Sequence, residues 1–166
     1  MTIVYFIDFE AFQCGQEPFT VKELCVMEHA ESARCIYHLY KPPKQWHELS
    51  EQQRRTYSYE EHRLHHLSWN EGIDERFCGE CLTHEMIRMF PNIFSDNAIC
   101  YVLGRQKCDF LRKTFPHLNL CVYPYANSRK ELPPPSRDHV CIYRNHGREH
   151  CAYIKCHRMC DDYNTL

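Results

Sequence analysis

The chain has 166 residues, of which 43% are hydrophobic and 25% charged, and its formal net charge is −2. This composition excludes disordered, collagen-like and coiled-coil proteins, and the length predicts one globular domain over residues 1–166. No apolar stretch approaches the roughly 18 residues of a membrane span, and acidic residues interrupt the N-terminal segment where a signal peptide needs an apolar run, so we expect a cytoplasmic or nuclear protein that makes no contact with a membrane.

The first part of the chain predicts an antiparallel meander of three strands. Residues 2–9, 19–27 and 34–40 are rich in β-branched and aromatic side chains and are joined by short links. Two prolines follow the third segment and end it, because proline lacks the amide that a β-ladder needs. Spaced apolar residues over 46–66 then indicate one or two short helices.

The rest of the chain alternates helical and extended patterns. Apolar spacing and turn residues predict, in order, a helix over 77–90, a strand over 97–104, a helix over 105–115, a strand over 118–124, a proline-rich loop over 126–138 and a last helix over 149–160. We therefore expect an α/β fold whose mixed sheet begins with the antiparallel meander and continues through alternating helices and strands.

Cysteine and histidine are both unusually frequent, with twelve of each. Six disulfides are one interpretation, but that device is typical of small secreted chains, whereas this chain is larger and lacks an export signal. We favour reduced thiols, several of which would pack in the core. Cys78-x2-Cys81 has the form of a redox or metal half-site, although its predicted helical position favours simple packing.

The clearest metal-binding pattern is Cys141-x4-His146-x4-Cys151. Thiolate sulfur and imidazole nitrogen are the ligands that a structural Zn²⁺ prefers, and such a site needs a fourth ligand, for which His139, His150 and the distant Glu23 are candidates. The alternative is two core cysteines beside a surface histidine.

Asp8 and Glu10 suggest a second kind of site. Residues two apart on a strand point to the same side, so both carboxylates can face one point, as binding of Mg²⁺ or Mn²⁺ requires. Asp109, which opens a predicted helix, and His150, which opens the last one, could add a third carboxylate and a general base. The alternative is an exposed acidic edge.

Basic residues concentrate in the second part of the chain. Residues 101–160 carry eleven Lys and Arg against four Asp and Glu, which favours contacts with phosphate, although a solvated surface is the simpler interpretation. Tyr123 and Tyr125 could stack on bases. The candidate phosphate contacts are Arg105, Lys107, Arg112, Lys113, Arg129, Lys130, Arg144 and Arg148.

Taken together, the order of elements and these residues resemble the RNase H-like superfamily, specifically the DEDDh-type 3′ to 5′ exonucleases. The resemblance gives Asp8, Glu10, Asp109 and His150 catalytic roles. It departs from the family at Lys155, which stands where the last metal-binding aspartate is expected. A cation there would repel Mg²⁺ from the site.

That departure is similar to the Maelstrom domain, a branch in which the acidic site is largely lost and a zinc ion is held by Glu, Cys, His and Cys. Residue by residue, the resemblance implies Glu23, Cys141, His146 and Cys151 as zinc ligands. It also implies binding or cleavage of single-stranded RNA.

Three functions follow as hypotheses. The first is a zinc-stabilised RNase H-like domain that binds nucleic acid, with single-stranded RNA favoured over DNA and with weak or absent nuclease activity. The second is an active exonuclease that depends on Mg²⁺ or Mn²⁺. The third is a protein-interaction module with a decayed site, in which the aromatic residues and the proline run 133–135 contact a protein partner.

Overall fold

The computed structural model describes residues 1–32, 34–141 and 149–166. Its centre is a five-stranded sheet with the order β3-β2-β1-β4-β5. The first three strands pair antiparallel, whereas β4 pairs with β1 and β5 with β4 in parallel, so the predicted α/β fold with a mixed sheet is confirmed. The strands are β1 (Ile3–Phe12), β2 (Thr20–Glu28), β3 (Cys35–Leu39), β4 (Ala98–Val102) and β5 (Leu120–Val122).

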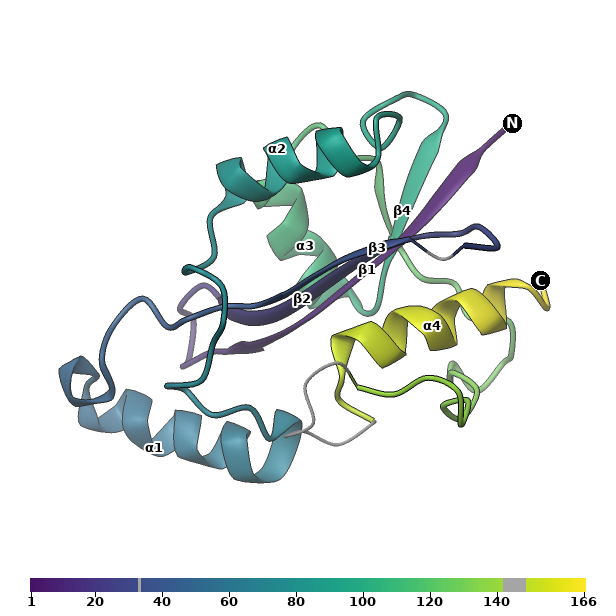
Figure 1. Cartoon of the computed structure of the whole chain (residues 1–166). Coiled ribbons are helices and arrows are strands. Elements are labelled where there is room, and N and C mark those ends of the chain that lie inside the picture. The colour runs from purple at the N-terminus through teal and green to yellow at the C-terminus, as the bar shows by residue number, and fades with distance from the viewer. Residues whose placement is uncertain (33, 142–148) are drawn as a thin grey trace.

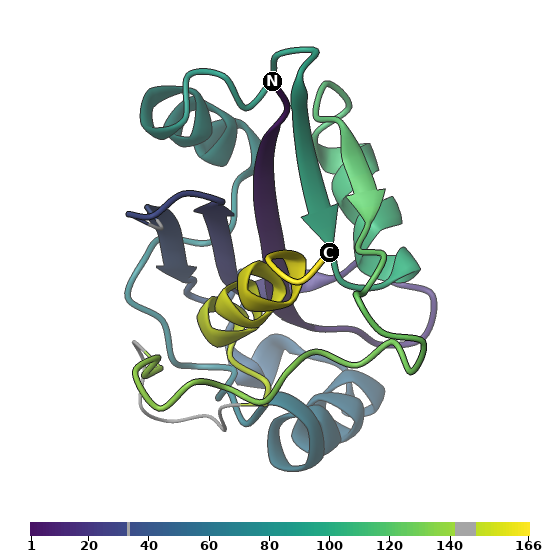
Figure 2. The same cartoon turned by 90° about the vertical axis from the view of Figure 1, so that its right-hand side faces the viewer.

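Helices cover both faces of the sheet (Figures 1 and 2). On one face, α2 (Gly79–Met89) and α3 (Arg105–Thr114) enclose the larger hydrophobic core. On the other face, α4 (Ala152–Tyr163) crosses the strands and closes a second core. The alternation of side chains along β1 follows this division: Tyr5 belongs to the α2 and α3 core and Phe6 to the α4 core.

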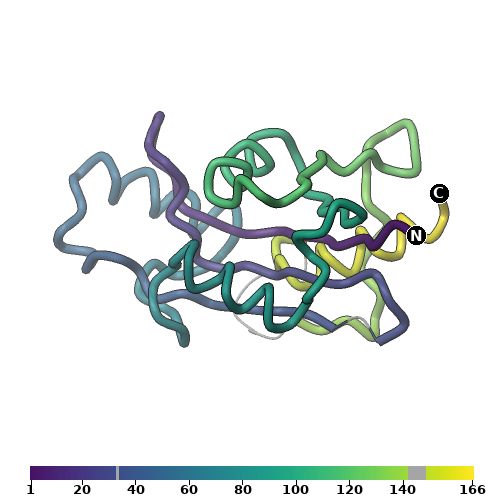
Figure 3. The backbone as a smooth tube through the Cα atoms, turned by 90° about the horizontal axis from the view of Figure 1, so that it is seen from above, coloured from purple at the N-terminus to yellow at the C-terminus, as the bar shows by residue number. Residues whose placement is uncertain are grey.

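The segment predicted as short helices forms η1 (Trp46–Glu48), α1 (Glu51–Glu60) and η2 (Glu61–His65), the last being a single π-helical turn. Ser50 caps α1 by accepting a hydrogen bond from the backbone N–H of Gln53. Seen from above, this segment and the two chain termini lie at opposite ends of the molecule (Figure 3). A small separate cluster around Phe12 and Trp69 holds it against the end of β1.

Lys22 joins this segment to the sheet. Its side chain is fully buried on β2, and its ammonium group donates hydrogen bonds to the backbone carbonyls of Tyr40, Trp69 and Glu71. Gly72 lies in the same connection, and a Cβ there would come within 2.5 Å of the backbone nitrogen of Lys41. The chain can approach β3 this closely only because the residue has no side chain.

Candidate functional site

A pair of carboxylates lies on β1, on the side of the sheet that α4 covers. Asp8 and Glu10 occupy alternate positions of the strand and share a face with Phe6. Both are buried, and the pairing register with β2 shifts directly after Glu10. The predicted convergence of the two acids is therefore confirmed, whereas the alternative of an exposed acidic edge is wrong.

Two lysines from opposite sides of the sheet meet this pair. Lys107 of α3 places its Nζ 2.8 Å from Asp8 Oδ1 and 3.7 Å from Glu10 Oε1. Lys155 of α4 donates a hydrogen bond to Glu10 Oε1, and its Nζ lies 3.8 Å from Asp8 Oδ2. The four side chains form a neutral cluster of two anions and two cations, which we call the carboxylate–lysine cluster.

The ionisation of the cluster follows from this geometry. Burial alone would raise the pKa of Glu10, but the ammonium groups of Lys107 and Lys155 outweigh it and hold that pKa below its usual value. Burial likewise opposes the charged form of Lys155, yet the carboxylates of Asp8 and Glu10 raise its pKa well above the ordinary range. Glu10 and Lys155 thus keep each other ionised near neutral pH.

A cleft of about 360 Å³ opens beside the cluster. The half-buried Lys155 forms part of its wall. Arg158 of α4 also lines the cleft but is committed to the loop beside it, because its guanidinium donates to the backbone carbonyls of Pro133 and Leu132. The lining residues are Leu103, Tyr125, Lys130, Glu131, Leu132, Glu149, Lys155 and Arg158.

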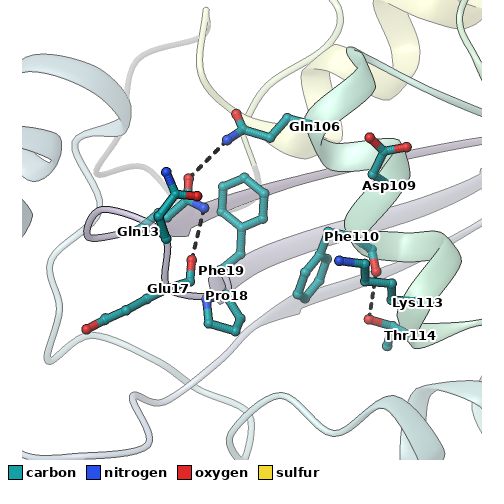
Figure 4. A pocket seen from close by; sticks show the side chains of 10 residues that line it. Gln13, Glu17, Pro18, Phe19, Gln106, Asp109, Phe110, Lys113 and Thr114 are labelled. Carbon is teal, nitrogen blue, oxygen red and sulfur yellow. Dashed lines mark hydrogen bonds between the residues drawn. The ribbon is translucent and has the colours of Figure 1, made fainter.

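The structure does not bring Asp109 to the other two acids. Its carboxylate lies on the exposed face of α3, 3.4 Å from the guanidinium of Arg112. There it lines a different cavity, of about 440 Å³, between α3 and the turn that joins β1 to β2 (Figure 4). The helix turns about 100° per residue, so Lys107 and Asp109 face in nearly opposite directions. Lys107 thus reaches the site that the sequence assigned to Asp109.

His150 lies closer to the cluster. It is half-buried just before α4, and its ring meets that of His66 at a centroid distance of 5.9 Å. Burial, followed by the positive charge of Lys155, lowers the pKa of His150 and so favours the neutral ring. A neutral imidazole can accept a proton, as the predicted general base must.

Asp162, further along α4, accepts hydrogen bonds from the Tyr123 hydroxyl and the Ala126 backbone N–H.

Three of the four predicted zinc ligands come together at the start of α4. Glu23 of β2 is fully buried, and its Oε2 lies 4.0 Å from the Cys151 sulfur. Cys141 hydrogen-bonds to the Cys151 thiol, which, together with burial and the charge of Glu23, raises the pKa of Cys151. The fourth predicted ligand, His146, lies outside the described residues, as do Arg144 and Arg148.

The surroundings of Glu23 bear on whether these residues suit a metal. Its carboxylate accepts hydrogen bonds from the Ala152 backbone N–H at 2.7 Å and from the Tyr37 hydroxyl at 2.5 Å. A buried carboxylate beside two thiols is a donor set suited to Zn²⁺. Within the described ranges, no group of three or more His, Cys, Asp or Glu is arranged to hold a metal. The donor types are ones that zinc accepts, the described residues alone do not form a metal site, and the predicted ligand His146 lies outside them.

Tyr37 was missed by sequence reasoning. Its hydroxyl orients the Glu23 carboxylate from the neighbouring strand, where Tyr37 is paired with Cys25. A signal was present, because a tyrosine two residues from the register partner of Glu23 on an adjacent strand has its polar tip within reach of that acid.

The predicted phosphate contacts divide into two groups. Arg105, Arg112 and Lys113 are exposed on α3, and Arg129 and Lys130 are exposed in the loop that follows β5. Lys107 instead points inward to the carboxylate–lysine cluster. Base stacking by Tyr123 is a wrong prediction, because its ring is buried and its hydroxyl is bonded to Asp162. Tyr125 is half-buried and borders the cleft.

Comparisons with family models, with curated proteins and with solved structures found no match to this chain. No disulfide joins the twelve cysteines, all of which lie within the described residues. In the part of the chain that the structure describes, no helix combines the length and the apolar character needed to cross a bilayer.

Proposed function

We propose that this chain is a zinc-stabilised RNase H-like domain that binds single-stranded nucleic acid, RNA above all, and that it has lost efficient two-metal hydrolysis. The order of elements supports the RNase H-like relationship: an antiparallel meander is followed by helix, strand, helix, strand and a last helix. The carboxylate–lysine cluster is the observation that carries the functional part of the proposal.

The cluster argues against a working two-metal centre. Divalent metal ions would need the oxygens of Asp8 and Glu10 that now face the ammonium groups of Lys107 and Lys155. A metal entering this site would also meet two positive charges, at least one of them in largely dehydrated surroundings where repulsion is strong. The exonuclease hypothesis therefore becomes the second candidate, supported only by the convergent acids and by His150.

Lys155, which stands where a metal-binding aspartate is expected, leaves a site that can bind phosphate without a metal. Lys155 borders the cleft, and the exposed Lys130 stands on the facing loop, so a phosphate in the cleft would meet two ammonium groups. Tyr125 offers part of an aromatic ring beside them. Arg105 and Lys113 are exposed on α3 and would offer further positive charge outside the cleft.

Zinc is proposed as a structural ion. The ion would be held by Glu23, Cys141, His146 and Cys151. Through these ligands it would crosslink β2 and the start of α4. Because the folding of such a site is coupled to metal binding, its removal should destabilise the domain as a whole. Elemental analysis of purified protein is expected to give one zinc per chain, and a fully folded sample free of transition metal would contradict this role.

Binding is tested by fluorescence anisotropy with a labelled single-stranded RNA in EDTA-free buffer without Mg²⁺ or Mn²⁺. For about four phosphate contacts, the affinity should fall by about 50-fold between roughly 50 and 200 mM salt. Lys130→Ala should weaken binding and lower the salt slope by about one contact. Lys44→Ala removes an equivalent exposed charge outside the cleft lining and should leave both unchanged.

The outcomes separate the three functions. Salt-independent affinity, or equal effects of Lys130→Ala and Lys44→Ala, would reject the cleft as a phosphate site. Release of mononucleotides that needs Mn²⁺ and disappears in Asp8→Ala would favour the exonuclease. Zinc at one per chain without binding of RNA or DNA would favour a protein-interaction module.

A further inference from the structure

Cys78 and Cys81 differ from the other cysteines in exposure. Of the twelve, all of which the structure describes, these two are exposed, while the rest are buried or half-buried. They also stand at the N-terminus of α2, with Cys78 as its N-cap residue. The pattern Cys-x2-Cys at a helix start is therefore presented to solvent, and the expectation of simple packing is wrong for both side chains.

The two sulfurs interact with each other and with the helix end. Cys78 Sγ accepts a hydrogen bond from the Cys81 backbone N–H at 3.4 Å, and the two thiols also hydrogen-bond to one another. These contacts, the backbone N–H of Cys81 first, lower the pKa of Cys78, while the thiol of Cys78 raises the pKa of Cys81. One sulfur is thus prepared to be the nucleophile and the other remains a thiol.

A cavity of about 220 Å³ adjoins the pair and is lined by both cysteines. On its far wall, His38 Nε2 lies 2.6 Å from Glu85 Oε2, and His38 Nδ1 lies 3.2 Å from Asp74 Oδ2. Acidic side chains outnumber basic ones in its lining. The acidic ones are Asp74, Glu75 and Glu85, and the basic ones are Arg76 and His38. The cavity therefore favours a ligand with positive charge.

Metal binding is the rival use of such a pair. Among the residues that the structure describes, no third His, Cys, Asp or Glu is arranged with them to hold an ion. Two thiols in mutual contact, open to solvent and without a further ligand, suit sulfur exchange better than coordination.

We propose that Cys78 and Cys81 form a redox-active dithiol that reduces external disulfides, with preference for disulfides flanked by positive charge. The Cys78 thiolate attacks one sulfur of the external disulfide, whose S–S bond breaks and releases the first thiolate, which takes a proton from water. The Cys81 thiol then loses its proton and attacks Cys78, and the second external sulfur leaves as a thiol. The external disulfide gains two electrons, and a Cys78–Cys81 disulfide remains.

The test uses the reduced, zinc-loaded chain of 166 residues with two small disulfides, the dicationic cystamine and the anionic oxidised glutathione. Samples are quenched with N-ethylmaleimide, and the products are located by peptide mapping. Wild type should form the internal Cys78–Cys81 disulfide, at least tenfold faster with cystamine. Cys81→Ser should accumulate a mixed disulfide on Cys78, and Cys78→Ser should lose the fast reaction.

Cys121→Ser, which alters a half-buried cysteine on β5, is the matched control and should react as wild type does. The strongest competitor is Cys35, a half-buried thiol whose pKa is lowered to about 7 by a hydrogen bond from Cys25. Fast modification at Cys35, a fast phase that persists in Cys78→Ser, or absence of a trapped adduct in Cys81→Ser would each overturn the proposal. Equal rates with the two disulfides would overturn the charge preference.

Discussion

Replacing Lys155 by methionine tests the carboxylate–lysine cluster most directly. The change keeps a long flexible side chain but removes the ammonium group that neutralises Glu10. The side chains of Lys155 and Glu10 are only 17% and 11% exposed, and that of Asp8 is fully buried. Removing one partner of a buried pair costs about 3–5 kcal/mol.

The lower end of that range is expected here. Lys107 remains 2.8 Å from Asp8, so one of the two carboxylates keeps a close cation. We expect Lys155→Met to lower the free energy of unfolding by about 3 kcal/mol, which corresponds to a fall in Tm of about 6–12 °C for a domain of this size. Urea denaturation followed by circular dichroism measures the free energy, and a differential scan measures Tm.

A second variant restores the charge balance. In Glu10→Gln/Lys155→Met both members of the pair are neutral, and Lys107 still compensates Asp8. The double variant should be more stable than Lys155→Met alone, with a coupling energy of about 1.5 kcal/mol or more. Lys113→Met, which removes an exposed charge from α3, should change stability by no more than about 0.5 kcal/mol.

The pH dependence adds an independent check. Because the pKa of Glu10 is lowered in the folded state, its ionisation contributes stability that is present above the unfolded pKa of 4.5 and is lost as the pH falls through the folded pKa. This acid-sensitive contribution should shrink in Lys155→Met. The reasoning is refuted if Lys155→Met costs no more than Lys113→Met, or if the double variant is no more stable than the single one.

Three further predictions concern two buried polar groups, Lys22 and Tyr123, and the half-buried Glu60. Lys22→Met removes the hydrogen bonds that the ammonium group donates to three backbone carbonyls. It should lower the free energy of unfolding, measured by urea denaturation, by about 3 kcal/mol. A decrease under about 1 kcal/mol would show that water takes the place of the ammonium group. Tyr123→Phe removes the 2.8 Å bond to Asp162 and should cost about 2 kcal/mol, with an unchanged Tm contradicting the assignment. Burial raises the pKa of Glu60 to about 7, so the folded state binds more protons between the unfolded value of 4.5 and about 7, and stability falls as pH rises through that window. Glu60→Gln keeps an acceptor for the Gln13 N–H and should be more stable than wild type at pH 8 but not at pH 5, and equal differences at both would contradict the shift.

The elements of the fold could be predicted because their signals are local. Alternation of side chains marks the strands, and prolines and turn residues mark their ends, so the structure's strands lie within a few residues of their predicted bounds. The last helix was displaced by three residues, since it begins at Ala152 and continues to Tyr163. Its start depends on Glu23, whose carboxylate accepts the Ala152 N–H from a distant strand, and no local pattern contains that information.

The candidate site was predictable only in part, because it depends on the rotational phase of helices. The two-residue period of a strand correctly predicts that Asp8 and Glu10 share one face of β1. On α3, a choice between Lys107 and Asp109 requires knowing which side of the helix meets the sheet. The inward Leu111 gives this phase, since it lies four residues after Lys107 and on the same side of the helix. Lys155 itself was visible in the sequence as a departure, but its hydrogen bond to Glu10 was not.

The attachment of α1 has a consequence for how the molecule varies and opens. Phe12, Leu49, Tyr57 and Trp69 form a cluster that, among the described residues, shares no member with the two cores on either face of the sheet. The region from η1 to Trp69 can therefore unfold locally while the sheet and its two cores stay folded. Its backbone amide protons should exchange with solvent faster than those of β1. Substitutions in this region should also cost the domain less stability than substitutions in the two cores.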